Sequence, residues 1–266
     1  MIKHEKQTGV PAFNEETFAE KQSDFCLLIP VINEGDRIRQ ELMRANKAGI
    51  EKIVDIIICD GDSTDGSVEG GLLTHFGVNT LLVKKSEGRQ GAQLRMGIYF
   101  ALKRGYKGIL TIDGNNKDSI ESVPLFIEKL NDGFDFVQGS RFIKGGEAIN
   151  TPFIRTVAVK LIHAPVISLT AKQKFTDTTN AFRGYSARYL SDVRTAPLRE
   201  VFTGYELLCY LSTRFATLGM QGCEVPVKRE YPKTGKTPTK ISPIKGNAGL
   251  LKVLFKNAFG QYTPKR

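Results

Sequence analysis

The first 140 residues alternate between short apolar runs and segments whose apolar side chains recur at helical spacing. The apolar runs predict buried strands at residues 25–32, 53–59, 78–83, 109–112 and 134–137. The segments between them predict helices at residues 34–49, 65–76, 91–104 and 120–130. Strand alternating with helix in this way is typical of βαβ units, so the sequence predicts an α/β fold with a mostly parallel sheet flanked by helices.

The second half of the chain is less regular. Its pattern predicts helices at residues 155–171, 185–196 and 202–218, and a strand at 222–228. A loop rich in Lys, Pro and Thr follows at 231–245, and then a basic, amphipathic segment at about 249–259. The first 22 residues are polar and are expected to form a loose extension.

Composition is that of a globular protein, with 41% hydrophobic and 25% charged residues in a chain of 266. The net charge of +10 gathers near the C-terminus, where residues 224–266 hold ten Lys or Arg and two Glu. Such a block indicates an anionic partner, which is a phosphate-bearing substrate, an anionic lipid or nucleic acid, unless it is only a solvated tail. Sparse aromatic residues and the lack of a nucleic-acid motif disfavour nucleic acid.

The cysteines, histidines and apolar stretches bear on whether the protein binds zinc, is secreted or spans a membrane. Four cysteines without a CxxC pair and three scattered histidines make a zinc site unexpected, and the cysteines fit reduced core positions in the cytosol. The N-terminus lacks a signal-peptide core. The nearest candidate for a membrane span, residues 157–171, is interrupted by Lys160 and Pro165, so no spanning helix is expected.

Two common nucleotide-binding motifs are missing from the sequence. No GxGxxG follows a predicted strand. Residues 235–237 (Gly-Lys-Thr) resemble the end of a P-loop, but Glu230 stands where that motif requires glycine. Dehydrogenase and P-loop NTPase functions are therefore disfavoured.

Polar clusters instead follow three predicted strands: Asn33 and Glu34, residues 60–65, and residues 113–115. In open parallel sheets ligands bind beyond the carboxyl ends of the strands, so three such clusters predict one site. A carboxylate in 60–65 suits a nucleobase or ribose, although a turn with a helix cap has the same sequence. In 113–115, oxygen side chains at i and i+2 can face one hard cation, although such a triplet is commonly a turn.

Eight short motifs follow one another within about residues 24–240: IPVINE (29–34), DGDSTDGS (60–67), GRQGAQLRMG (88–97), TIDGNN (111–116), GSRF (139–142), TDTTNAFRGYS (176–186), GYE (204–206) and EVPVKREYPKTGKTPTK (224–240). In this order they resemble the motifs of family 2 glycosyltransferases of the GT-A fold. The chain is most similar to polyprenyl- and dolichyl-phosphate sugar synthases and to bacterial envelope-polysaccharide transferases.

The resemblance implies a role for each matched residue. The nucleotide-sugar would be bound by Pro30, Ile32, Glu34, Asp60, Asp62, Arg89, Arg95, Gly114, Arg141, Lys236 and Lys240. The catalytic residues would be Asp113, Glu206, Asp177 and Arg229, with Asp177 and Arg183 in the acceptor-side motif. Asp113 and Asn115 would hold Mg²⁺ or Mn²⁺.

The sequence departs from the family pattern at the metal motif and beside it. Asn115 replaces the second carboxylate, which removes one negative charge and should weaken cation binding. Two positions further on, where the synthases often have Gln, stands Lys117, which either contributes positive charge or points to solvent. Asp118 is a possible replacement ligand, and Gly61 replaces the second Asp of the usual DDGS.

The implied reaction is inverting transfer of a sugar from a UDP- or GDP-sugar to a lipid-linked acceptor, by an enzyme at the inner face of the cell membrane. Glu206 would be a base for a hydroxyl acceptor, or else a helix cap. The alternatives are a catalytically weak scaffold and a transferase for soluble saccharides; a nucleotidyltransferase lacks its phosphate loop. The expected units are an extension (1–22), a GT-A domain (23–245) with nucleotide-sugar (23–145) and acceptor (146–245) halves, and a segment (246–266) that lies on an anionic membrane or packs on the domain.

Overall fold

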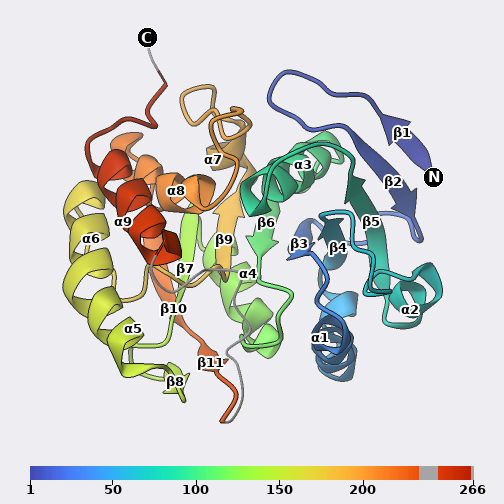
Figure 1. The fold of residues 1–266 in the computed structure, drawn as a ribbon, viewed down its shortest axis with the longest axis horizontal. Helices are drawn as coiled ribbons and strands as arrows, with labels where there is room; N and C mark the ends of the chain where they lie inside the picture. The colour runs from blue at the N-terminus through green and yellow to red at the C-terminus, as the bar shows by residue number, and fades with distance from the viewer. Residues whose placement is uncertain (234–244, 265–266) are drawn as a thin grey trace.

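The computed structural model describes residues 1–233 and 245–264. Its centre is a nine-stranded sheet in the order β1-β2-β5-β4-β3-β6-β9-β7-β10 (Figure 1). The strands are β1 (Ile2–His4), β2 (Phe13–Thr17), β3 (Phe25–Val31), β4 (Asp55–Asp60), β5 (Val78–Lys84), β6 (Gly108–Thr111), β7 (Phe136–Ser140), β9 (Arg183–Ser186) and β10 (Gly222–Pro226). β5, β4, β3 and β6 run parallel, and so do β7 and β10, which confirms the predicted α/β fold.

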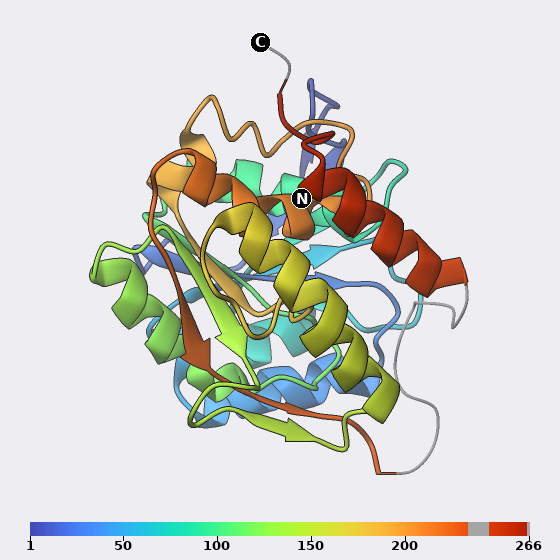
Figure 2. The ribbon, with the colours of Figure 1, turned by 90° about the vertical axis from the view of Figure 1, so that its left-hand side faces the viewer.

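Helices cover both faces of this sheet (Figures 1 and 2). They are α1 (Asp36–Lys47), α2 (Gly70–His75), α3 (Gln90–Lys103), α4 (Val123–Asn131), α5 (Phe153–Ala158), α6 (Ala164–Ala171), α7 (Ala187–Ser191), α8 (Glu206–Thr217) and α9 (Lys245–Ala258). Neighbouring strand residues such as Leu27 and Leu28 enter two different apolar cores. Because the central strands are buried on both faces, they appear in the sequence as continuous apolar runs.

The first 22 residues are not a loose extension, as the sequence analysis expected. β2 pairs antiparallel with β5, and β1 pairs antiparallel with β2, so this segment extends the sheet. Phe13 is buried, and the His4 ring stacks on it at 4.3 Å between centroids. The pairing relies mainly on backbone hydrogen bonds, which a polar sequence such as FNEET does not reveal.

The second half contains strands that the sequence did not predict. β9 lies antiparallel between β6 and β7, and β8 (Glu147–Ile149) pairs with β11 (Lys228–Glu230) in a small parallel sheet. α7 is also much shorter than the helix expected at 185–196.

A π-helical turn, Val159–His163, joins α5 and α6 into one helix from Phe153 to Ala171. This helix is long and apolar enough to cross a membrane by length and composition, and only 17% of its apolar window is buried, in contrast to the expectation of no such segment. Lys160 lies within the π turn and Pro165 follows that turn, and the helix continues through both residues.

α9 spans most of the segment that was predicted to be amphipathic, and some of its apolar side chains pack on the domain. Leu254 is buried in the core shared with α8, and the amide Nδ2 of Asn257 donates to Thr213 Oγ1 at 3.0 Å. Phe255 and Phe259 remain exposed. The segment was expected either to lie on an anionic membrane or to pack on the domain. Packing on the domain explains one face of α9.

Candidate active site

The loops that follow β3, β4 and β6 meet at one edge of the sheet, as the three polar clusters predicted. The amide of Asn33 donates to Ser63 Oγ at 3.0 Å, and Asn33 Oδ1 accepts from the amide of Thr64 at 2.8 Å. A Cβ added to Gly114 would lie 3.1 Å from side-chain methyl groups of Ile29 and Val31. Glycine at this position thus lets the loop after β6 pack directly against β3.

Asp60 organises its own loop. One carboxylate oxygen, Oδ2, accepts from the amides of Asp62 and Ser63 at 2.9 Å each, and Oδ1 accepts from Ser63 Oγ at 2.5 Å. Burial raises the pKa of Asp60, although these hydrogen bonds oppose the rise. Asp62 is exposed and paired with Lys85 at 2.6 Å. The segment forms a turn, but it does not cap a helix, because α2 begins only at Gly70 with Glu69 as its N-cap residue. A contact with a base remains a prediction.

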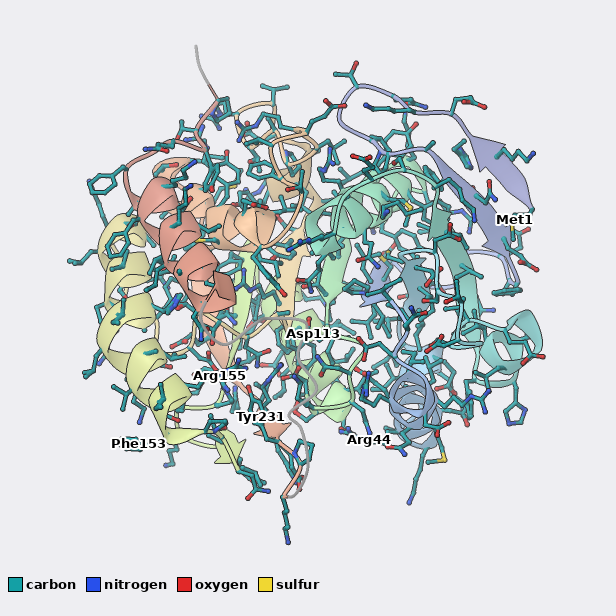
Figure 3. The ribbon with its side chains drawn as sticks, viewed as in Figure 1. Met1, Arg44, Asp113, Phe153, Arg155 and Tyr231 are labelled. Atoms are coloured by element: carbon teal, nitrogen blue, oxygen red, sulfur yellow. The ribbon has the colours of Figure 1, made fainter. Side chains whose placement is uncertain are left out.

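Asp113 lies at the centre of this edge (Figure 3), with 21% of its side chain exposed. Its Oδ1 accepts from Gln90 Nε2 at 2.9 Å, and its Oδ2 lies 3.4 Å from Arg229 Nη2. Burial alone would raise the pKa of Asp113, but Arg229 and Lys117 lower it. Asp113 is therefore an anion at neutral pH, held between an amide and a guanidinium.

Asn115 provides a second oxygen beside Asp113. Its Nδ2 lies 3.3 Å from Asp113 Oδ2, while its Oδ1 is buried without a hydrogen-bond partner. The described residues contain no group of three or more His, Cys, Asp or Glu arranged to hold a metal. A dication that takes its other ligands from phosphates and water fits an orphaned oxygen beside a carboxylate, and Mg²⁺ commonly binds in this way.

Asp118, the replacement ligand considered in the sequence analysis, is fully buried and pairs with Arg229. Its Oδ2 accepts from Arg229 Nη1, while its Oδ1 has no hydrogen-bond partner among the described residues, so a role as a metal ligand stays a prediction. Arg229 lies on β11 and is itself buried. Burial favours the neutral form of Arg229, but Asp118 and Asp113 hold its pKa well above the usual value. Arg229 thus remains a cation shared between two carboxylates.

Further cations surround Tyr231, which follows β11. The Nζ of Lys117 lies 5.3 Å from the centre of the Tyr231 ring, and the guanidinium of Arg229 lies 5.8 Å from it. Burial would raise the pKa of Tyr231, but Arg229, Arg155 and Arg141 lower it to about 8. Burial and repulsion from Arg229 lower the pKa of Lys117 to about 8 as well. The side chain of Lys117 is buried, so it does not point to solvent.

Arg155 joins this cluster from α5, the start of the long exposed helix (Figure 3). Its Nη1 donates to the hydroxyl oxygen of Tyr231 at 2.8 Å. A hollow of about 680 Å³ opens beside Asn115, Lys117 and Tyr231, and Arg44 and Lys233 also line it. The site therefore combines positively charged side chains with open space beside Asn115 and Lys117.

Arg141 and Asp177, which were assigned to different ligands, pair with each other. Nε and Nη2 of Arg141 donate to the two oxygens of Asp177 at 2.6 and 3.0 Å, and both side chains are buried. Glu224 supports this pair by accepting from the amides of Thr176 and Asp177. Arg141 Nη1 is buried without a partner. One guanidinium nitrogen thus remains available to an anion, whereas Asp177 positions Arg141.

Three other expected roles do not match the observed contacts. Arg95 is wrong as a nucleotide ligand, because it is buried and donates to the carbonyl oxygens of Gly9 and Leu198. Arg183 is likewise occupied by backbone oxygens such as those of Asn180 and Thr178. Glu206 Oε2 accepts from the amide of Gly204 at 2.6 Å, which fits the capping role proposed as the alternative to a base.

The remaining predicted residues divide by position. Pro30 is the second-last residue of β3, and Glu34 forms an ion pair with Arg37 at 2.8 Å. Arg89 is exposed just ahead of α3. Lys236 and Lys240 lie outside the described residues. The positions of these residues leave the nucleotide-binding roles of Pro30, Ile32, Glu34 and Arg89 as predictions.

Sequence reasoning missed residues that position the site from outside the polar clusters. Gln93 Nε2 donates to the carbonyl oxygens of Val31 and Cys59, which ties together the ends of β3 and β4. Glu41 of α1 is fully buried and accepts from the amide of Asn116 at 2.9 Å. A glutamate on the buried face of a predicted helix is the signal that would have identified Glu41.

Comparison with known proteins finds glycosyltransferases that are similar to this chain. No family model matches the sequence. The chain is 24% identical to the dolichol-phosphate mannosyltransferase of Pyrococcus furiosus, over 80% of this chain and 54% of that protein. It is 24% identical to the polyprenol monophosphomannose synthase of Mycolicibacterium smegmatis, over 76% of this chain and 75% of that protein.

A solved structure shares the fold. The glucosyl-3-phosphoglycerate synthase of Mycobacterium tuberculosis, solved in complex with Mn²⁺, UDP and phosphoglyceric acid, superposes with a TM-score of 0.63. The match covers 91% of this chain and 79% of that one, at 15% identity. The fold is thus that of GT-A glycosyltransferase structures. The names of the relatives and of this structure indicate a glycosyltransferase that is similar to family 2 of these enzymes, and the chain spans about half the length of the Pyrococcus relative.

Proposed function

We propose that this glycosyltransferase moves a sugar from a UDP- or GDP-sugar to the phosphate of a lipid-linked acceptor, with inversion at the anomeric carbon. One observation carries the proposal: a buried cationic cluster beside Asp113 lies at the foot of an exposed apolar helix. An amphiphile with an anionic head and an apolar chain matches both features. The names of the two relatives, which refer to dolichol phosphate and polyprenol, support the same class of acceptor.

The donor would bind where the loops after β3, β4 and β6 meet. The structural neighbour was solved with UDP and Mn²⁺, which supports a nucleotide and a dication for this fold. Here Asp113 Oδ2 and Asn115 Oδ1 would hold Mg²⁺ or Mn²⁺ together with the diphosphate. When bound, such an ion offsets negative charge on the leaving group.

Positive side chains of the protein would act on the same leaving group. The nucleoside diphosphate gains negative charge as the glycosidic bond breaks, and preorganised cations stabilise that charge. Arg229 and Lys117 lie beside Asp113 and would stabilise this charge. Lys236 and Lys240 are proposed for the same role from the sequence. The second guanidinium, Arg141, offers its unpaired Nη1.

The contacts of Glu206 favour a phosphate acceptor over a hydroxyl. A hydroxyl acceptor requires a general base within hydrogen-bond reach, and the carboxylate of Glu206 is held by the amide of Gly204. A phosphate monoester is already ionised at neutral pH and needs no base. Arg155, whose Nη1 reaches Tyr231, would bind that phosphate from the side of the apolar helix.

The helix from Phe153 to Ala171 would rest on the inner face of the cell membrane. Phe153, Ile154 and Leu161 are 80%, 82% and 72% exposed. The basic residues Lys160 and Lys172 lie on the same helix or at its end, and they would attract anionic lipid headgroups.

Serine at Phe153, Ile154 and Leu161 together should weaken binding to phosphatidylglycerol vesicles by about tenfold or more, because burying each large apolar side chain contributes about 1.5–3 kcal/mol when complete. Co-sedimentation with vesicles measures this. Val193→Ser is the matched control, because Val193 is 87% exposed but follows α7 on another part of the surface. Equal binding by the triple variant and the wild type would remove this helix from the proposed membrane contact.

The function itself is tested by mixing the protein with UDP- and GDP-sugars and one acceptor at a time. Undecaprenyl phosphate in detergent, 3-phosphoglycerate and a soluble oligosaccharide are the three acceptors. Released nucleoside diphosphate is the readout. We expect stimulation by the lipid phosphate. Stimulation by only 3-phosphoglycerate or the oligosaccharide would keep the transferase and replace the acceptor, whereas no release with any pair would favour a scaffold.

A further inference from the structure

Lys117 brings a positive charge into the place where the nucleotide diphosphate is expected. Its side chain is 5% exposed and lies over the ring of Tyr231, with Nζ 5.3 Å from the ring centre. It interacts electrostatically with Asp113 and Arg229. Lys117 is therefore part of the cluster at Asp113 rather than of the surface.

Within the group of Asp113, Asp118, Lys117 and Arg229, two negative charges meet two positive charges without a metal, and Asn115 is neutral. Arg155 and Arg141, which act on Tyr231, add further positive charge beside this group. A free dication prefers a net negative set of oxygens, which this cluster does not present. A diphosphate, in contrast, meets two cations that are already in place.

Two departures from the family pattern, at Asn115 and Lys117, also favour a diphosphate over a free dication at this cluster. Asn115 in place of an aspartate removes one negative charge, and Lys117 in place of glutamine adds one positive charge. Together they make the motif more positive by two charges, which equals the charge of Mg²⁺ or Mn²⁺. The two substitutions thus compensate electrostatically for a metal that is absent or weakly bound.

We infer that Lys117 binds the donor diphosphate directly and that a divalent cation strengthens this binding without being required for it. The inference rests on the proposed nucleotide-sugar donor. Charge-assisted contacts from Lys117 and Arg229 to phosphate oxygens hold the nucleotide when no metal is present. A metal at Asp113 and Asn115 then adds to them.

Calorimetric titration of the whole protein with UDP and GDP, in excess Mn²⁺ and in EDTA, tests the inference. For the wild type we expect the better nucleotide to bind less than about tenfold more weakly in EDTA. Lys117→Gln should bind it about tenfold more weakly than the wild type in EDTA, the size of one charge-assisted hydrogen bond, and nearly equally in Mn²⁺. Lys117→Arg should resemble the wild type.

The reverse change provides an independent readout. The double variant Asn115→Asp, Lys117→Gln should bind Mn²⁺ alone more tightly than the wild type and should require it for nucleotide binding. Loss of wild-type nucleotide binding in EDTA would overturn the inference and leave the donor proposal intact, and this result needs no variant to fold. Equal loss by Lys117→Gln with and without Mn²⁺ would also overturn it. Failure of both nucleotides to bind under every condition would instead overturn the proposed function.

Discussion

Replacing Arg229 with methionine is expected to abolish sugar transfer and to lower the free energy of unfolding by about 3–5 kcal/mol, the usual cost of breaking a buried ion pair. Arg229 is the cation that compensates Asp118, which is fully buried, and it also contacts Asp113. Without it, Asp118 must remain charged in the interior or take up a proton. Denaturant unfolding, followed by circular dichroism, measures the stability.

Two features separate this result from a general effect of losing an arginine. Arg194→Met removes the solvent-screened pair with Asp192 and should leave the free energy of unfolding nearly unchanged. The deficit of the Arg229 variant should shrink as the pH falls, because burial already raises the pKa of Asp118 and protonation relieves the uncompensated charge. A stability loss as small as that of the Arg194 control would contradict the role given to Arg229.

Asp113→Asn is expected to reduce the rate of sugar transfer by a factor on the order of 10²–10³, which is typical for removing one preorganised electrostatic group from an active site. The change removes the partly exposed carboxylate of the motif, whereas the carboxylate of Asp118 is fully buried and paired with Arg229. Stability should change by less than about 1 kcal/mol, because Asp113 is partly exposed and Arg229 keeps its pair with Asp118.

The measurement is steady-state release of nucleoside diphosphate from the preferred donor. Asp132→Asn is the matched control, because Asp132 is exposed and pairs only with Lys129 among the contacts of the described residues. Asp113→Asn with a rate within about tenfold of the wild type would place the chemistry elsewhere on the protein.

Much of the parallel half of the fold follows from the sequence. The apolar runs of β3, β4 and β5 are long because both faces of these strands are buried, and this pattern is visible without a structure. The convergence of the polar clusters also follows, because the carboxyl ends of parallel strands lie on one edge. Asp113 and Asn115 could therefore be assigned to the site before their contacts were known.

Pairing between side chains could not be predicted in the same way. Arg141 and Asp177 are 36 residues apart, and their mutual ion pair depends on how the loops after β7 and before β9 approach each other. Arg95 lies in one of the motifs that carry the family resemblance, but its guanidinium donates to the carbonyl oxygen of Gly9 in the N-terminal segment, a contact that depends on the folded chain. β1 and β2 were not predicted because their side chains are mostly polar. Strands that pair mainly through backbone hydrogen bonds need not show apolar alternation in the sequence.

The cationic surroundings of Tyr231 were also beyond the sequence. Lys117, Arg155 and Arg229 come from three separate segments, and only the folded chain brings them to one ring. The sequence predicted a loop rich in Lys, Pro and Thr at 231–245; Tyr231 begins it, and Arg229 lies just ahead of it on β11. The exposure of α5 beside this cluster is what connects the anionic and apolar features of the proposed acceptor.

Transfer of radiolabelled sugar from the preferred nucleotide donor to undecaprenyl phosphate tests the central proposal most directly. After extraction with organic solvent, we predict a labelled lipid that releases its sugar in mild acid, as a glycosyl phosphate does. The label should be absent with Asp113→Asn and strongly reduced with Arg155→Gln, which leaves Asp113 and Arg229 in place. Label that stays in the aqueous phase with every donor, or that enters the lipid equally with Asp113→Asn, would contradict the proposal.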